Sequence, residues 1–458
     1  MRCIGACAEH AAGFLTGYGS FAERVLNMKR RKLLLLLATF LLIIGTLAAH
    51  SLAHRKAKGR RMPNGDVVMN PFQTLPIGQV FAAHRIKEVQ TERLTSSLAP
   101  VAVRQNGPDG PRYQEALGYR FLIYTAGFPG LCRMEDGRLV LTMSTGGELA
   151  AGGYLRGRKR RGFVLFSRDQ GRTWTQPRPL ATMRSAAPLA LGGGRLLVRV
   201  DTHSLLFSDD AGTSWSQPEP IPLLTGGRAS NSDVALSCLV EGNTVTCIFY
   251  ANKLPPEKGL ETFLRRYDTA SHTWSDPVVL PANWTTSEGA LVRAATGELV
   301  AVFRSDRPQI PPPDKGPSSD HWSGLISTRS ADNGLTWSEP TVETLYGHVH
   351  QSLLRLADGR LVMTYGARIG ELDGRDYQGI EAVISHDHGR TWDWERRYIL
   401  FRGTSSHMQS PQSVVLSDGR ILTCFMHHVD FPWATDEDRR GKLRYVSQVA
   451  VVIWSLQP

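Results

Sequence analysis

Short runs of strand-forming residues, separated by tight polar turns, recur along most of the chain. The clearest copy surrounds Asp358-Gly359, where apolar residues precede the turn at Leu354 and Leu356 and follow it over residues 361–365. Asp-Gly between two such runs is the turn chemistry of a β-hairpin. Glycines in a comparable setting occur at six places, namely Gly137, Gly194, Gly242, Gly297, Gly359 and Gly419. The pattern predicts six hairpins.

A second kind of turn, Ser-x-Asp-x-Gly-x-Thr/Ser-Trp, follows most of these hairpins. Its good copies are SRDQGRTW from residue 167, SDDAGTSW from 208, SADNGLTW from 330 and SHDHGRTW from 385, and a worn copy, YDTASHTW, ends at Trp274. In the good copies the Asp can accept hydrogen bonds from nearby backbone N–H groups, and the Gly supplies a backbone conformation that other residues resist. The Trp provides an apolar anchor. Each copy is predicted to fold as the same local unit.

Repeats of roughly 40 to 60 residues with several strands each are typical of a β-propeller, in which small sheets pack around an axis. Six hairpins predict an all-β fold with six blades, occupying residues 81–458 as one domain. The last hairpin, at Gly419, has no Asp turn after it, and the chain ends in a strand-like run over 447–455. We therefore expect an N-terminal strand, near Ile86 to Leu94, to close the last blade.

The N-terminal region differs in kind from the repeats. The first 61 residues hold 11 Lys and Arg against two Glu, a net charge of +9 out of +11 for the whole chain. The remainder is nearly neutral, so the high pI does not indicate binding of nucleic acid. We divide this region into a basic segment at 1–32, an apolar segment at 33–53 and a linker at 54–80.

The apolar segment has no charge between Leu33 and Ala49. Such a run suits either a signal peptide or a single membrane anchor. Small residues at Ala48, Ala49 and Ser51 fit a cleavage site, whereas basic residues on both sides leave the orientation of an anchor open. In both cases we expect an exported protein, which is periplasmic, at the cell surface or anchored in a membrane.

The six cysteines are scattered and have no metal-ligand spacing, so we predict no metal and no cofactor. Cys238 and Cys247 would face each other across the hairpin at Gly242-Asn243. A disulfide is conceivable there in an exported protein, and two reduced, buried thiols are the alternative that we favour.

With these motifs the chain, over about residues 115–457, resembles the sialidase (neuraminidase) superfamily and its Asp-box repeats, and it is most similar to exported bacterial sialidase-like proteins. The resemblance is strongest in TSEGALVRAATGELVAVFR (286–304) and HVHQSLLRLADGRLVMTYGAR (348–368). It implies that Arg304 and Arg368 bind a substrate carboxylate, since guanidinium groups match a carboxylate bidentately. It also implies that Glu288 assists the reaction.

The chain departs from this family at two positions. Gly127 stands where the resemblance implies a first arginine, and the start of the last blade, HMQSPQSVV (407–415), lacks the expected nucleophilic Tyr. Tyr398 is a candidate by distance from Arg368, although its setting resembles an outer strand. Glu148 is the nearest carboxylate to the expected acid/base position. These departures point away from ordinary sialic acid cleavage.

A hydrolase for another sugar could use two carboxylates, one as acid and the other as base or nucleophile. The candidates are Glu148, Glu288, Asp320 and Glu381. Asp320 ends an irregular loop (308–320) beside His321 and Trp322, whose indole could stack on a sugar, but it could also be a capping residue. Glu381 alternates with apolar residues and could equally be a buried partner of an arginine.

Histidines form the last group of candidates. His348 and His350 precede a strand and would point the same way, and His407, His427 and His428 could converge nearby. They could bind a metal, although we favour hydrogen bonds to a substrate. Arg304 and Arg368 could each instead be structural ion-pair residues.

The sequence thus predicts a sialidase-like glycoside hydrolase acting on an acidic or hydroxylated sugar, a glycan or polysaccharide. A non-catalytic propeller that binds carbohydrate or protein is the alternative, and a polysaccharide lyase is a third possibility.

Overall fold

The computed structural model describes residues 99–105, 112–121, 126–145, 161–175, 177–180, 185–200, 204–229, 238–281, 285–306, 323–372, 375–403, 409–430 and 445–456. All of them belong to one unit, Ala57–Pro458. The apolar segment 33–53 lies outside these residues. Within the described ranges, no helix is long and apolar enough to cross a membrane.

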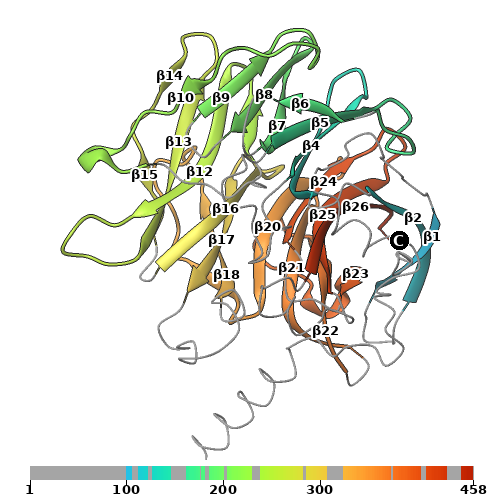
Figure 1. Cartoon of the computed structure of the whole chain (residues 1–458). Coiled ribbons are helices and arrows are strands. Elements are labelled where there is room, and N and C mark those ends of the chain that lie inside the picture. The colour runs from blue at the N-terminus through green and yellow to red at the C-terminus, as the bar shows by residue number, and fades with distance from the viewer. Residues whose placement is uncertain are drawn as a thin grey trace, which may run out of the picture. The chain divides into compact units, whose positions relative to one another are not determined.

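The described strands form six antiparallel blades, as the six hairpins predict (Figure 1). Blades 1 and 2 are each four-stranded sheets, with β3 (Ala126–Arg133), β4 (Leu139–Thr145), β5 (Arg161–Ser167) and β6 (Arg178–Leu180) in the first, and β7 (Ser185–Gly192), β8 (Arg195–Val200), β9 (Ser204–Ser208) and β10 (Glu219–Pro220) in the second. A short 3₁₀ helix, η2 (Thr225–Gly227), follows blade 2.

Blades 3 and 4 differ at their outer edges. Blade 3 contains β11 (Leu239–Glu241), β12 (Thr244–Asn252) and β13 (Leu260–Asp268), and two short strands, β14 (Thr273–Trp274) and β15 (Val278–Val279), share its outer edge on β13. Blade 4 is regular, with β16 (Thr285–Arg293), β17 (Leu299–Asp306), β18 (Ser323–Ser330) and β19 (Thr341–Thr344).

Blades 5 and 6 are joined in one nine-stranded sheet of the described chain. Blade 5 contains β20 (His348–Arg355), β21 (Leu361–Leu372), β22 (Arg375–Ser385) and β23 (Tyr398–Gly403), with the 3₁₀ helix η4 (Trp394–Arg396) before its last strand. Blade 6 contains β24 (Gln409–Val415), β25 (Ile421–Asp430), β26 (Tyr445–Trp454) and β2 (Arg112–Phe121). β1 (Ala99–Gln105) pairs with β2, and its last two residues, Arg104 and Gln105, also pair with β23.

An N-terminal strand closes the last blade, as the sequence predicts, but its location differs from the prediction. β2 pairs antiparallel with β26, from Leu117 opposite Ile453 to Phe121 opposite Val449. The segment near Ile86 to Leu94, which we expected in this role, lies outside the described residues. β2 supplies the outer strand that the Gly419 hairpin and the following strand lack.

The core of the propeller is divided among the interfaces between blades. The described residues contain six buried hydrophobic clusters, and each cluster joins two neighbouring blades. The cluster around Phe425 and Trp454, for example, packs blade 6 against Phe401 of blade 5. Contacts between successive inner strands complete the ring from β24 back to β3. Each sheet therefore buries its two faces only by lying between neighbours.

The Asp turns have the hydrogen bonds that the sequence predicts. In blade 5, Asp387 Oδ1 accepts from the backbone N–H of Thr391 at 2.8 Å, and Asp387 Oδ2 accepts from the Thr391 hydroxyl at 2.6 Å. Ser385 Oγ accepts from the backbone N–H of Gly389 at 2.7 Å. The glycine has a φ of 85°, and an added Cβ would lie 2.9 Å from Val300 of blade 4. The turn therefore also fits one blade against the next.

The four cysteines of the described residues are free thiols, so Cys238 and Cys247 are reduced as we favoured, but they are not fully buried as we expected. Cys132 and Cys424 are buried, whereas Cys238 and Cys247 are half-buried. A hydrogen bond to Cys238, followed by burial, raises the pKa of Cys247. The two thiols therefore lie side by side across the inner hairpin of blade 3.

The Asp turns predict a loss of stability in acid. The Thr336 hydroxyl lowers the pKa of Asp332 from 3.8 to about 2, and the Ser214 hydroxyl does the same for Asp210. Because these folded-state values lie below the unfolded value, the stabilisation is present above pH 3.8 and is lost as the pH falls towards 2. Urea unfolding between pH 5 and 2.5 should show a midpoint that falls with pH.

The double variant Asp210→Asn/Asp332→Asn should flatten that fall, because neither side chain then changes its charge. Asp209→Asn is the matched control, since it removes an exposed carboxylate beside Asp210 that is not part of the turn motif. If the double variant keeps the pH dependence of the unmodified protein, the turns do not contribute in this way.

Candidate functional site

Four innermost strands carry a non-glycine residue in the left-handed backbone region at the same place. Phe128, Glu288, His350 and Ser410 have φ values of 51°, 39°, 54° and 54°. Each stands nine positions before the glycine of its own hairpin, at 137, 297, 359 and 419. A register shift in the pairing with the next strand accompanies each one. These are β-bulges, which often occur beside active sites.

The four bulges belong to blades 1, 4, 5 and 6, and these blades follow one another around the ring. β16 contacts β20, β20 contacts β24, and β24 contacts β3. We call Glu288, His350, Ser410 and Phe128 the bulge arc. A non-glycine residue in this region costs about 1–3 kcal/mol, so the surrounding structure must hold each residue in place. The arc is therefore the first place to look for a function.

Glu288 and Arg304 form a buried ion pair in blade 4. Arg304 lies opposite Ser287 in the pairing of β16 with β17, so its side chain starts beside the bulge. Arg304 Nη1 donates to Glu288 Oε1 at 2.9 Å, and the two side chains are 9% and 6% exposed. His350 Nδ1, from blade 5, lies 3.4 Å from Glu288 Oε2. The sequence-predicted residues Glu288, Arg304 and His350 are thus brought together.

Hydrogen bonds from neighbouring strands hold this group. Arg304 Nε donates to Ser323 Oγ at 2.8 Å and lies 3.4 Å from Asp306 Oδ1, and Ser323 Oγ donates to the same Asp306 atom. Gln351 Nε2 donates to the backbone carbonyl of Glu288 and to that of Val302, the latter at 2.8 Å. Blade 5 therefore fixes the backbone at the bulge of blade 4.

Arg368 is one of the largest fully buried side chains among the described residues. It lies in a second irregularity of blade 5, where the pairing of β21 with β22 shifts between Ala367 and Gly370. Its backbone N–H donates to the carbonyl of Gly347 at 2.6 Å, next to the start of β20. Two candidate binding arginines therefore occur on adjoining blades, 4 and 5.

Glu381 lies elsewhere, in the packed interface of blades 4 and 5. Tyr365 Oη donates to Glu381 Oε2 at 2.6 Å, and Arg397 Nε lies 3.4 Å from the same atom. Burial raises the pKa of Glu381, against the effect of Arg397. β22 is two strands out from the innermost strand. Glu381 is thus a buried partner of Arg397, which is the alternative that the sequence left open.

His348 belongs to that interface as well. Its ring packs edge-on against Tyr365, with centroids 5.1 Å apart, and lies near Trp394. Burial lowers the pKa of His348 to about 4, so its imidazole is neutral at pH 7. His348 and His350 thus lie in different surroundings, because the bulge changes the direction of the strand between them.

The remaining candidates fall into two groups. Tyr398 is a core residue, 2% exposed, on the outer strand β23, with its ring 5.1 Å from that of Trp454. Glu148, Asp320, Trp322 and His407, and the side chains of His427 and His428, lie outside the part of the chain that is described. Within that part, no group of three or more His, Cys, Asp or Glu side chains could hold a metal ion.

The sequence did not point to Phe128 or Ser410 as site residues. A signal was available, because both stand at the same distance from a hairpin glycine as Glu288 and His350 do. Only the backbone, however, shows that this distance marks a bulge. The arc places a carboxylate, an imidazole, a hydroxyl and an aromatic ring on four successive blades, with an arginine against the carboxylate. Such groups can bind an anion, transfer a proton and stack on a sugar ring.

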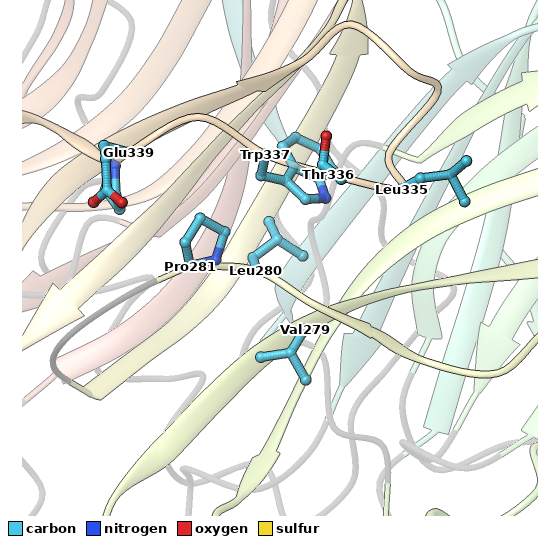
Figure 2. A pocket seen from close by; sticks show the side chains of 8 residues that line it. Val279, Leu280, Pro281, Leu335, Thr336, Trp337 and Glu339 are labelled. Carbon is cyan, nitrogen blue, oxygen red and sulfur yellow. The ribbon is translucent and has the colours of Figure 1, made fainter.

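A hollow of about 500 Å³ lies elsewhere, at the outer edges of blades 3 and 4 (Figure 2). Val279, Leu280 and Pro281 line one side, and Leu335, Thr336 and Trp337 of the blade 4 Asp turn line the other, with Glu339 beyond them. Pro340 completes the lining. It contains none of the candidate catalytic or binding residues that the sequence singled out.

No protein-family model matches the sequence, and no curated protein matches it. A protein of unknown function from Dyadobacter fermentans has a similar structure, with a TM-score of 0.53 and 19% identity over 72% of this chain and 95% of that one. NanB sialidase of Streptococcus pneumoniae has a TM-score of 0.48 and 13% identity, over 72% of this chain and 68% of that one. An α-L-arabinanase of Penicillium chrysogenum, solved with arabinobiose, has a TM-score of 0.49 and 12% identity, over 78% and 98%. At these identities the likeness concerns the fold.

The buried ion pair generates a prediction about stability. Glu288→Ala should lower the free energy of unfolding by about 3–5 kcal/mol, because it leaves the charge of Arg304 buried without its carboxylate. Glu288→Ala/Arg304→Ala should cost less than the sum of the two single variants, with a coupling energy of about 1–3 kcal/mol in urea unfolding.

Glu241 and Arg293 provide the matched control. They also form an Arg–Glu pair between neighbouring blades, with Arg293 Nη2 at 2.7 Å from Glu241 Oε2, but this pair is more exposed and lies at the hairpin end of the strands. Its coupling should be below about 1 kcal/mol. Equal coupling in the two pairs would contradict a special, buried role for Glu288 and Arg304.

Proposed function

We propose that this protein is an exported, sialidase-like glycoside hydrolase that binds an acidic or heavily hydroxylated sugar at the bulge arc. The observation that carries the proposal is the buried group of Glu288, Arg304 and His350, in which Glu288 and His350 occupy left-handed bulges of two adjoining blades. A charged pair and two strained backbones are costly in a protein interior. A binding function at this place gives a reason for keeping them.

In this proposal Arg304 and Arg368 bind the acidic group of the sugar, since the guanidinium fork matches a carboxylate. Glu288 orients Arg304 and assists the reaction, with His350 against its second oxygen. Hydrolysis needs a group that protonates the leaving oxygen and a second that activates water or attacks the anomeric carbon. Glu148 and Asp320 remain our candidates for the second carboxylate, and Trp322 for a stacking residue.

The proposed location follows from the N-terminal region. A signal peptide or anchor at 33–53 would export the propeller and leave it in the periplasm, at the cell surface or attached to a membrane. The expected partner is a glycan or polysaccharide. Nucleic acid is not expected, because most of the net positive charge precedes the propeller.

A specific observation also favours a non-catalytic carbohydrate-binding propeller. Both carboxylate oxygens of Glu288 are engaged, one by Arg304 and the other beside His350. A carboxylate that is paired with Arg304 in this way can orient the arginine without transferring a proton. Binding without cleavage would need only the arginines and the arc.

The test is hydrolysis by the full chain of fluorogenic sialosides, uronides and neutral glycosides. Glu288→Gln should lower kcat about 100-fold or more if the carboxylate takes part in proton transfer. Arg304→Lys should mainly raise KM for acidic substrates, because a lysine cannot form the bidentate contact.

Glu241→Gln and Arg293→Lys are the matched controls, since they make the same changes in the ion pair at the hairpin end of the strands. Both should cleave at the unmodified rate. Binding of a glycan without cleavage, lost in Arg304→Lys, would establish the binding module instead. Cleavage that survives in Glu288→Gln and Arg304→Lys would place the active site elsewhere.

A further inference from the structure

The function proposed above gives no individual role to two members of the bulge arc, Ser410 and Phe128. They nevertheless share its backbone signature, with φ values of 54° and 51° at the position nine residues before a hairpin glycine. Glycine adopts this conformation without a penalty, yet all four arc positions carry a side chain. The presence of a side chain at each of these positions, in place of glycine, therefore requires an explanation.

Ser410 is 1% exposed, and its Oγ has no hydrogen-bond partner among the described residues. Buried hydroxyls in native proteins are normally hydrogen-bonded, and one that is not needs a specific reason. Ser410 is also next to Pro411, so the neighbouring residue offers no backbone N–H. The Ser410 hydroxyl is therefore buried, lies on a strained backbone and is able to form a hydrogen bond with a ligand. Its strand, β24, is next to the strand of His350.

Phe128 stands at the far end of the arc, on β3 of blade 1, and its side chain is only half-buried. The described core cluster of the blade 6 and blade 1 interface uses Leu131, Met143 and Phe163, and does not include Phe128. β24 and β3 are in contact, so Ser410 and Phe128 lie on neighbouring inner strands. A half-buried aromatic ring can pack against the apolar face of a sugar.

We propose that Ser410 and Phe128 are ligand-contacting residues of the same site, and that the arc binds one acidic pyranose unit. The sugar carboxylate contacts Arg304, a sugar hydroxyl bonds to Ser410 Oγ, and the apolar face of the ring lies on Phe128. This inference rests on the proposed function, because it uses Arg304 as the anion-binding residue. It assigns a hydroxyl-recognition group to blade 6 and a stacking group to blade 1.

The experiment is titration calorimetry of the full chain with sodium D-glucuronate and with N-acetylneuraminate as probes, together with thermal unfolding. Ser410→Ala should weaken binding about 3- to 10-fold, the usual effect of one hydrogen bond. Phe128→Leu should weaken it about 3- to 10-fold through loss of the ring face.

Ser410→Gly separates the hydroxyl from the backbone strain. It should weaken binding as much as Ser410→Ala does, and it should raise the unfolding temperature because glycine relieves the left-handed conformation. Ala211→Gly is the matched control, since Ala211 has a φ of 58° in the Asp turn of blade 2. That variant relieves the same kind of backbone outside the arc and should not change binding. If Ser410→Ala does not fold, binding by Ser410→Gly and Phe128→Leu shows whether the Ser410 hydroxyl and the Phe128 ring contact the ligand.

The outcomes are distinct. Binding of a probe that is lost in Arg304→Lys but unchanged in Ser410→Ala, Ser410→Gly and Phe128→Leu would overturn the inference and leave the proposed function standing. No binding of either probe by the unmodified chain would overturn both the inference and the acidic-sugar function. Weaker binding in the Ser410 and Phe128 variants, with Ala211→Gly unchanged, would support the inference.

Discussion

Pairing of β2 with β26 is the interaction on which the rest of the structure depends. Each blade buries its faces only against its neighbours, and the described core is accordingly divided into one cluster for each interface. Such an arrangement is stable only when the ring closes. β2 completes blade 6, and β1 extends the same sheet to β23 of blade 5. Closure then keeps the inner strands at the distance at which residues from different blades can meet.

The candidate site uses that closure at a place where the backbone is least regular. Glu288 and His350 come from different blades, and Gln351 of blade 5 supports the carbonyl of Glu288 in blade 4. The propeller thus supplies a rigid frame, and the bulges turn single side chains out of the regular alternation of a strand. A regular strand would send these residues into the packed interfaces, where His348 and Glu381 are found.

The sequence was sufficient for the features that depend on neighbouring residues. Six turn glycines predicted the six hairpins, and Asp387 with Ser385 and Thr391 predicted the hydrogen bonds of its turn. The grouping of Glu288 with Arg304 was inferred from a resemblance, and the structure shows the two side chains in contact.

Other features depend on distant parts of the chain. Nothing local in residues 112–121 identifies β26 as their partner, more than 300 positions away. Phe128 and Ser410 have no motif of their own, and the surroundings of Glu381 become visible only when Arg397 and Tyr365 are packed beside it.

The order of strands in blade 6 has a consequence for how the protein is made. β2 precedes all the other strands of its blade, and its partner β26 is the last described strand of the chain. During synthesis β2 must therefore wait, unpaired on that side, until five blades and most of the sixth have emerged. Pairing between segments so far apart is slow, because a long loop must close before any contact is gained. Until β26 is available, β2 keeps one edge of its sheet open, and the unpaired backbone N–H and C=O groups of that edge can pair with another chain.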